Sequence, residues 1–365
     1  MQLRRLHSYI ERAKRILRQT GEIRVSLPDT IVYPSLPLPR FVPPDIADWL
    51  LQNPHMQTVY DVSYGRKRKR ELRFVMPCKD SKATRNAVEL MSVWSIVCDL
   101  NNPNLQIPGV TTLIYPHQAQ KYLPDTPTIA PGPEHANSGY CTLGHKRLPS
   151  EIVIFREEEW FKVFIHESIH AWALDGGIDM SLPLQADVAD VFPSVDSPSM
   201  QEAYTEAWAR IGLCAMLSDR KDRTASEWVV ECQRRLAVEQ VHGMRQIQGI
   251  LGSVGLTLND MTGKQGSLYK ERTNVFAYYV LASLFVLTYP AFMAWCASTG
   301  PTLMLPPPLR ASRGGGALGK LVPLVLMPSL NHAVKVLSQY PPPESGSMRM
   351  SAHTVELNCM VPNLD

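Results

Sequence analysis

The strongest constraint on how this chain folds is a stretch of apolar residues that carries two histidines four positions apart. Residues 160–174 read WFKVFIHESIHAWAL, and the helix-stopping sequence DGG follows. This pattern predicts a helix over residues 157–174. Because residues four apart lie one turn above each other on a helix, His166 and His170 are expected side by side on one face.

The same two histidines have the spacing of a zinc site. Residues 166–170 read HESIH, an HExxH motif, in which both imidazoles can reach one Zn²⁺ at about 2.0–2.1 Å. Glu167 then lies beside a zinc-bound water, whose pKa zinc lowers to about 7. As general base, Glu167 takes the proton of this water and delivers it to the leaving amine. The alternative is a pair of core or surface histidines without a metal, but burying them unpaired is costly.

A catalytic zinc takes a third protein ligand and keeps one position open. Residues 199–210 read SMQEAYTEAWAR and place Glu202 and Glu206 on one face of a second helix. One carboxylate can bind the metal while the other accepts the N–H of a ligand histidine. Ser199 and Glu202 also fit a capping box, which would engage the Glu202 side chain with backbone. We favour Glu202 as the ligand and keep Glu206 as the second candidate, whereas Asp175 lies off the ligand face.

HESIH followed by a helix with Glu-x-x-x-Glu resembles the gluzincin branch of zinc metallopeptidases. The resemblance implies that the zinc ligands are His166, His170 and Glu202 and that the general base is Glu167. It also implies that Glu206 is an acid that braces a ligand histidine. Gln201 and Glu206 stand where well-known gluzincins usually carry Asn and Asp. The implied activity is hydrolysis of peptide bonds in a polypeptide substrate, with Zn²⁺ as cofactor.

Several segments narrow the resemblance to metallopeptidases encoded by large DNA viruses. They are HANSGYCT, EIVIFREEEWFKVFIHESIH, EAYTEAWARI, TNVFAYYVL and SMRMS, which lie within residues 135–351. The resemblance implies a place in the cytoplasm or nucleus of a host cell, or packaging in a virus particle. It also implies a substrate-binding edge strand that contains Asn137, Ser138 and Gly139, for which an ordinary hairpin strand is the alternative.

A residue that stabilises the transition state is expected from the C-terminal half of the chain. The residues of suitable chemistry there are His242, Tyr269, Tyr278 and Tyr279. Nothing in the sequence distinguishes among these four.

The order of the elements predicts an α+β chain. Strands are expected at 72–76, 110–117, 137–142 and 151–156, with a helix at 84–100. This order resembles a zincin: a small mixed or antiparallel sheet with a backing helix and an active-site helix, then a mainly helical subdomain. The resulting divisions are an arm at 1–70, a zincin-like domain at 71–300 (sheet and active-site helix at 71–178, helical part at 197–300) and a wrapping tail at 301–365.

The predicted arm begins with a basic amphipathic helix. Its apolar positions have helical spacing and alternate with arginines and lysines: Leu3, Leu6, Ile10, Ala13 and Leu17. The proline-rich residues 27–54 are expected to be extended. Five consecutive cations at 66–70 suit a solvated turn, a nuclear-import signal or a phosphate contact.

One segment has the length of a membrane span. Residues 274–299 contain no charged side chain. However, tyrosines, a serine, a threonine and Pro290 interrupt it, so we favour a buried core helix that breaks near Pro290 over a membrane-spanning one.

Composition limits the partners. The net charge is only +3, with 37 Lys and Arg against 34 Asp and Glu, so we predict no specific nucleic-acid partner. An odd number of cysteines, 7, without a CxxC pair, and a start without an apolar signal region, favour a reduced intracellular setting over secretion. The alternative to an enzyme is a structural component of a virion or large complex, whose segments 1–54 and 301–365 bind neighbouring proteins.

Overall fold

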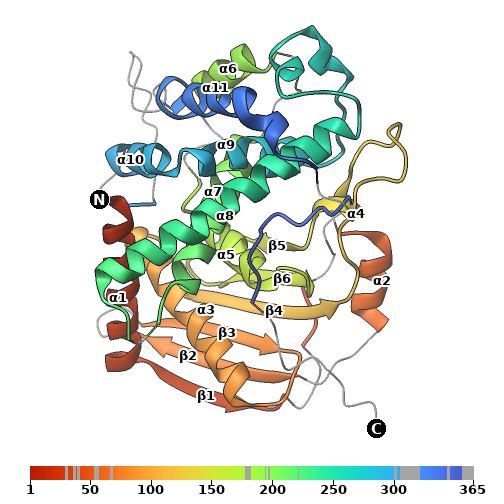
Figure 1. The fold of residues 1–365 in the computed structure, drawn as a ribbon. Helices are drawn as coiled ribbons and strands as arrows, with labels where there is room; N and C mark the ends of the chain where they lie inside the picture. The colour runs from red at the N-terminus through yellow and green to blue at the C-terminus, as the bar shows by residue number, and fades with distance from the viewer. Residues whose placement is uncertain are drawn as a thin grey trace. The chain divides into compact units, whose positions relative to one another are not determined.

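The computed structural model describes residues 1–28, 32–35, 38, 42–52, 57–65, 69–176, 182–193, 195, 198–220, 222–299, 302–304, 321–342 and 346–355. The chain divides into two compact units (Figure 1). The sheet unit comprises His7–Ala119, Asn137–Ala173 and Thr354–Asp365, and the helical unit comprises Met1–Leu6, Gln120–Ala136 and Leu174–His353. Three of the five consecutive cations, residues 66–68, lie outside the described residues, as do residues 305–320 of the predicted tail.

The sheet unit is built on a mixed six-stranded sheet, in agreement with the predicted α+β class. Its strands are β1 (Glu22–Ser26), β2 (Thr58–Tyr64), β3 (Arg70–Met76), β4 (Gly109–His117), β5 (Gly139–Thr142) and β6 (Ser150–Arg156). Their order is β1-β2-β3-β4-β6-β5. β3, β4 and β6 run parallel, and the other neighbours are antiparallel.

Apolar side chains cover both faces of this sheet. Helix α5 (Trp160–Ala171) packs against β5, β6 and the backing helix α3 (Lys82–Asn101), and Phe74 meets Phe164 edge-on at 6.2 Å. On the opposite face, Ile46 and Leu50 of α2 (Pro44–Gln52) join a core cluster that includes Val153. The central strands β4 and β6 therefore bury side chains on both faces, whereas the edge strand β1 is exposed.

The structure differs from the expected extended arm at residues 27–54. The described part of this segment contains α2, which begins at Pro44 with Asp45 in its first turn and a bond from Ala47 N to Pro43 O of 2.8 Å. Proline at a first helical position and an acid in the first turn both favour a helix start. The prolines therefore mark the beginning of a helix here. In addition, β1 and β2 lie within the predicted arm at 1–70 but belong to the sheet.

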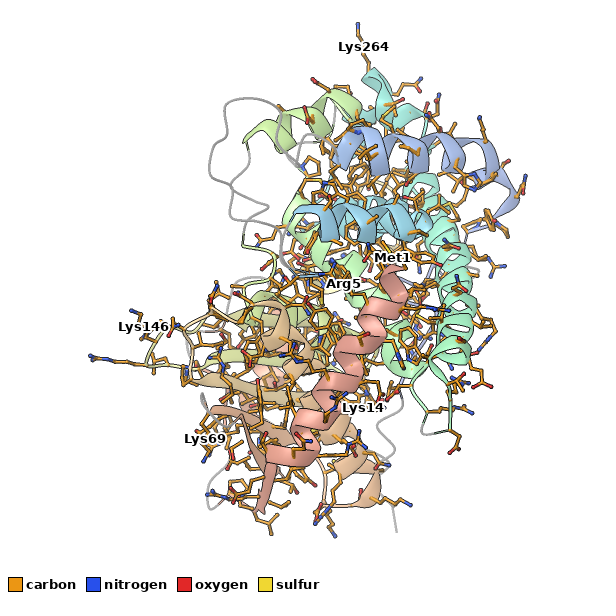
Figure 2. All side chains as sticks on the ribbon, turned by 90° about the vertical axis from the view of Figure 1, so that its left-hand side faces the viewer. Met1, Arg5, Lys14, Lys69, Lys146 and Lys264 are labelled. Carbon is orange, nitrogen blue, oxygen red and sulfur yellow. The ribbon has the colours of Figure 1, made fainter. Side chains whose placement is uncertain are left out.

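The predicted amphipathic helix is confirmed as α1 (Gln2–Thr20), whose five predicted apolar positions are all buried. Arg4, Arg12, Arg15 and Arg18 of this helix are exposed. Figure 2 shows Arg5 and Lys14 on α1 and Lys69 and Lys146 on the sheet unit.

Arg70, the last of the five cations, has a structural role instead of a solvated one. It is 1 % exposed, forms an ion pair with Asp99 at 2.8 Å and donates to the carbonyls of Leu105 and Ile107. Its guanidinium carbon lies 5.2 Å from the ring centre of Trp172. Only long-range contacts make this residue different from its exposed neighbour Lys69.

The helical unit is built around two long helices (Figure 1), α7 (Met200–Leu217) and α8 (Ala225–Gly252). A capping box between Thr224 and Glu227 starts α8. The other helices are α4 (Pro133–Ala136), α6 (Leu182–Val191), η3 (Phe276–Leu281), α9 (Ala282–Leu287), α10 (Tyr289–Thr299), η5 (Val322–Leu326) and α11 (Met327–Val336), with short turns η1 (Asp260–Thr262), η2 (Lys264–Leu268) and η6 (Leu337–Gln339).

The uncharged segment 274–299 breaks beside Pro290, as predicted. Within the part of the chain that the structure describes, no single helix is long and apolar enough to cross a membrane. Phe276–Leu287 and Tyr289–Ser298 meet that test only together, as a pair bent by 91°. Leu284 and Phe285, at the middle of the segment, are buried within the protein.

The half-buried carboxyl of Glu271, just before this segment, should make stability depend on pH. Burial raises the pKa of Glu271 from 4.5 to about 7, although Tyr269 OH and Phe276 N donate to it at 2.8 and 2.6 Å. Because the folded pKa exceeds the unfolded one, the folded protein binds more protons between these values. The free energy of unfolding should therefore fall by at most about 3 kcal/mol as pH rises from 4.5 to 7.

Urea unfolding across this pH range, with the parent and Glu271→Gln, tests the expectation. The variant keeps a hydrogen-bond acceptor but does not titrate, and every other carboxyl titrates in both proteins. Its stability should fall less steeply with pH; parallel curves would show that Glu271 does not titrate in this range.

Candidate metal centre

Helix α5 brings the HExxH residues into the sheet unit between two left-handed backbone positions. Glu159 precedes the helix with φ 59°, and Ala173 follows it with φ 49°. The amide of Ala173 donates to the carbonyl of His170 at 2.8 Å. A left-handed residue just past a helix end is usually glycine, so Ala173 ends α5 slightly before the predicted DGG sequence.

The two histidines of the motif face each other on α5. Their Nε2 atoms are 3.2 Å apart, and their ring centres are 5.0 Å apart. Two nitrogens bound at about 2.0–2.1 Å to one tetrahedral zinc lie about 3.3–3.4 Å from each other. The pair thus has the spacing that a zinc ion needs. The same distance suits a hydrogen bond between the rings when one Nε2 is protonated.

Glu167 is buried against the edge strand β5. A Cβ placed on Gly139 of β5 would lie 3.4 Å from Glu167 Cγ, 2.7 Å from Val163 Cγ1 and only 2.9 Å from the carbonyl oxygen of Val153. Glu167 is 7 % exposed. Only glycine lets the strand approach α5 this closely, and this requirement fixes the carboxylate beside the strand.

Of the three residues predicted to bind substrate, Asn137 and Ser138 directly precede β5, and Gly139 begins it. This strand is last in the sheet order and antiparallel to β6. The carbonyl of Asn137 accepts from Arg156 Nε at 3.0 Å, and that of Ser138 accepts from Phe155 N at 2.9 Å. Because bonded and non-bonded pairs alternate in an antiparallel ladder, the N–H and C=O of Gly139 are turned away from β6.

The two candidate glutamates lie on α7, in the helical unit, and differ in their surroundings. Ser199 caps the helix by accepting from Glu202 N at 3.2 Å, and the side chain of Glu202 is half-buried in the first turn. Glu206 is fully buried and accepts from Arg210 Nε at 3.0 Å. Arg210 also donates to Ser283 Oγ at 2.9 Å.

Gln201, next to Glu202, donates to Asp175 at 2.6 Å. Asp175 is buried, and it therefore helps to hold the first turn of α7 within the helical unit. Asp175 was predicted not to be a ligand, and its sequence position alone does not indicate this contact. On a helix, the side chain four positions after Glu206 lies beside it and can form an ion pair with it. The spacing in the sequence could therefore have predicted the ion pair between Glu206 and Arg210.

Within the sheet unit, the described residues bring together the histidine pair, and the ligand-type side chain of Glu202 belongs to the helical unit. Imidazole nitrogens and a carboxylate oxygen are usual zinc ligands. The histidines belong to the sheet unit and Glu202 to the helical unit.

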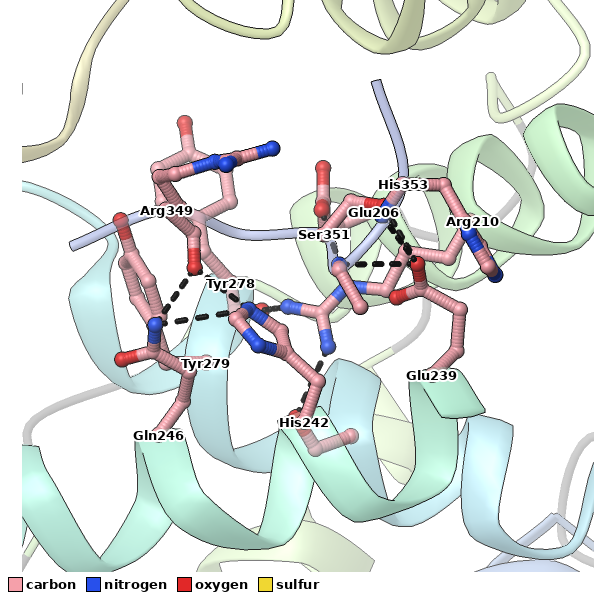
Figure 3. A network of polar contacts seen from close by, with 12 residues as sticks. Glu206, Arg210, Glu239, His242, Gln246, Tyr278, Tyr279, Arg349, Ser351 and His353 are labelled. Carbon is pink, nitrogen blue, oxygen red and sulfur yellow. Dashed lines mark hydrogen bonds and ion pairs between the residues drawn. The ribbon is translucent and has the colours of Figure 1, made fainter. Parts of the chain in front are cut away.

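The four candidates for a transition-state stabiliser are all in the helical unit, and Figure 3 shows His242, Tyr278 and Tyr279. The side chains of three of them form hydrogen bonds within this unit: His242 Nε2 with the carbonyl of Arg349, Tyr269 OH to the carboxylate of Glu271, and Tyr279 OH to the carbonyl of Met348. Tyr278 accepts from Arg210 through its backbone carbonyl.

Comparison of the chain with protein-family models, with curated proteins and with solved structures finds no match.

The close approach of β5 to α5 gives a stability prediction. Gly139→Ala should lower the free energy of unfolding by about 1–3 kcal/mol, because the new methyl meets a backbone oxygen that cannot rotate away. Gly252→Ala is the control, since no atom lies within 4 Å of its added Cβ. Urea unfolding of both variants measures the difference, and equal stabilities would contradict the packing described.

Proposed function

We propose that this chain is a zinc-dependent metallopeptidase. His166 and His170 would bind the metal with Glu202, and Glu167 would act as general base. The observation that carries the proposal is the separation of 3.2 Å between the two Nε2 atoms on a buried helix. It is supported by the burial of Glu167 in the next position, where a carboxylate would otherwise be costly to enclose.

The arrangement of the sheet unit supports a zincin-like fold as part of the proposal. A helix with HExxH packs on a mixed sheet beside a backing helix, and an antiparallel edge strand lies next to it. When bound, zinc would supply a Lewis acid that makes water more acidic and polarises a carbonyl. Glu167 would accept the proton as water attacks the peptide carbon, and would return it to the nitrogen when the C–N bond breaks.

A polypeptide substrate suits the edge strand. The outward N–H and C=O of Gly139 can pair with an extended peptide, as in strand addition. Asn137 and Ser138 use their carbonyls toward β6 and Arg156, so they would position the strand more than contact the peptide backbone. Binding proteins through segments 1–54 and 301–365 in an assembly stays a prediction.

Glu167→Gln tests the mechanism. The variant should keep the zinc content of the parent, because Glu167 is not a ligand, but should lose turnover, because an amide does not accept the proton. His166→Ala should lose one equivalent of zinc as well as activity. Release of new amino termini from denatured proteins and metal analysis measure both; equal turnover by parent and Glu167→Gln would exclude the proposed role.

Glu202→Gln and Glu206→Gln test the third ligand. Glu202→Gln should sharply weaken zinc binding with little loss of stability, since it replaces an anionic donor by a neutral one. Glu206→Gln should lower stability by about 3–5 kcal/mol, because it leaves the buried Arg210 without its carboxylate. If the bracing role holds, it should also cost about 10–100-fold in zinc affinity or activity.

Zinc titration and urea unfolding of each variant separate these effects. Ser199→Ala is a control that weakens the helix cap by about 1 kcal/mol without removing a carboxylate. Loss of zinc from Glu206→Gln together with full zinc binding by Glu202→Gln would assign the ligand to Glu206.

A further inference from the structure

A second group of ligand-type side chains lies wholly inside the helical unit. Cys214 of α7, Glu239 of α8 and His353 come from three separate segments, yet one ligand atom from each lies within 4.8 Å of the others. Cys214 and Glu239 are fully buried, and His353 is half-buried. The predicted zinc motif contains none of these residues.

His353 ends a segment that we call the strap, residues 346–353, which lies against α8 (Figure 3). One carboxylate oxygen of Glu239 accepts from Ser351 Oγ and from the amides of Ala352 and His353, the latter two at 2.9 and 3.3 Å. Three donors on one oxygen fix the orientation of the carboxylate plane. The second oxygen of Glu239 is therefore held at a defined place in the unit.

The tautomer of His353 follows from its neighbour. His353 Nε2 lies 3.1 Å from the carbonyl oxygen of Arg235. A carbonyl only accepts, so Nε2 carries the hydrogen and Nδ1 keeps a lone pair. Histidines that bind metals usually donate their other ring N–H to a carbonyl or carboxylate in this way.

We propose that Cys214 Sγ, Glu239 and His353 Nδ1 bind a divalent metal ion of the zinc type. Sulfur, imidazole nitrogen and carboxylate oxygen together are a donor set that zinc accepts. A thiolate and a carboxylate neutralise the two charges of the ion, which suits a buried place. Such an ion would join α7, α8 and the strap, and would be separate from the HExxH centre.

The cysteine makes this site distinguishable by spectroscopy. The HExxH pair and Glu202 contain no sulfur, so absorption from thiolate-to-cobalt charge transfer can come from the second site alone. The test is to remove metal from the full-length protein with a chelator, titrate it with Co²⁺ and record the near-ultraviolet spectrum. The parent should develop this band and bind two equivalents.

Variants then show which residues give rise to the charge-transfer band. Cys214→Ser should lose it and one equivalent of cobalt, while His166→Ala should keep the band and lose the other equivalent. Cys296→Ser is the matched control, because Cys296 is another fully buried cysteine of the helical unit outside the group. It should leave the band unchanged.

His353→Gln provides an assay that does not depend on replacing a core side chain. It should weaken cobalt binding at the site that gives the charge-transfer band by more than about 100-fold. This loss exceeds the usual effect of replacing a residue that only forms a hydrogen bond to a metal ligand. A parent without the band, a band that survives Cys214→Ser, or unchanged affinity in His353→Gln would each overturn the proposal. Failure of the HExxH centre would instead appear as a parent that keeps the band and binds one equivalent.

Discussion

The burial of polar side chains on the otherwise apolar helix α5 is the constraint on which the sheet unit depends. Helix α5 carries His166 and Glu167 into an interior formed by β5, β6 and α3, with His170 half-buried, and unpaired polar groups there are destabilising. The histidines satisfy each other or a shared ion across 3.2 Å. The close contact at Gly139 keeps the edge strand beside the carboxylate. The contacts that stabilise the core of the sheet unit thus also hold the side chains of the HExxH motif in place.

The helical unit encloses charge by a different principle. Glu206 forms an ion pair with Arg210, which is one turn further along α7. Arg210 also donates hydrogen bonds to Ser283 and to the carbonyl of Tyr278. Glu239 is oriented by hydroxyl and amide donors of the strap. Removing one member of such a network leaves the others buried and uncompensated. Side chains far apart in sequence are therefore linked through a few polar atoms.

Periodicity predicted the elements whose apolar pattern is local, such as α1, α3, α5 and the strands from β3 to β6. It missed α2, because a double proline suggested an extended chain, although Pro44 begins a helix. It also missed the structural role of Arg70, since Asp99 and Trp172 reach it only through folding. The HExxH spacing placed two histidines together because helix geometry alone decides that distance; the surroundings of Glu202 and Glu206 depend on tertiary packing.

The strap has a consequence for how the protein is made. Glu239, His242 and Gln246 of α8 each bond to residues about a hundred positions later in the chain. The helical unit also includes Met1–Leu6. Its core is therefore complete only after synthesis has passed residue 353, while the first residues have long left the ribosome. A nascent chain must keep the apolar faces of α7 and α8 from aggregating during that interval.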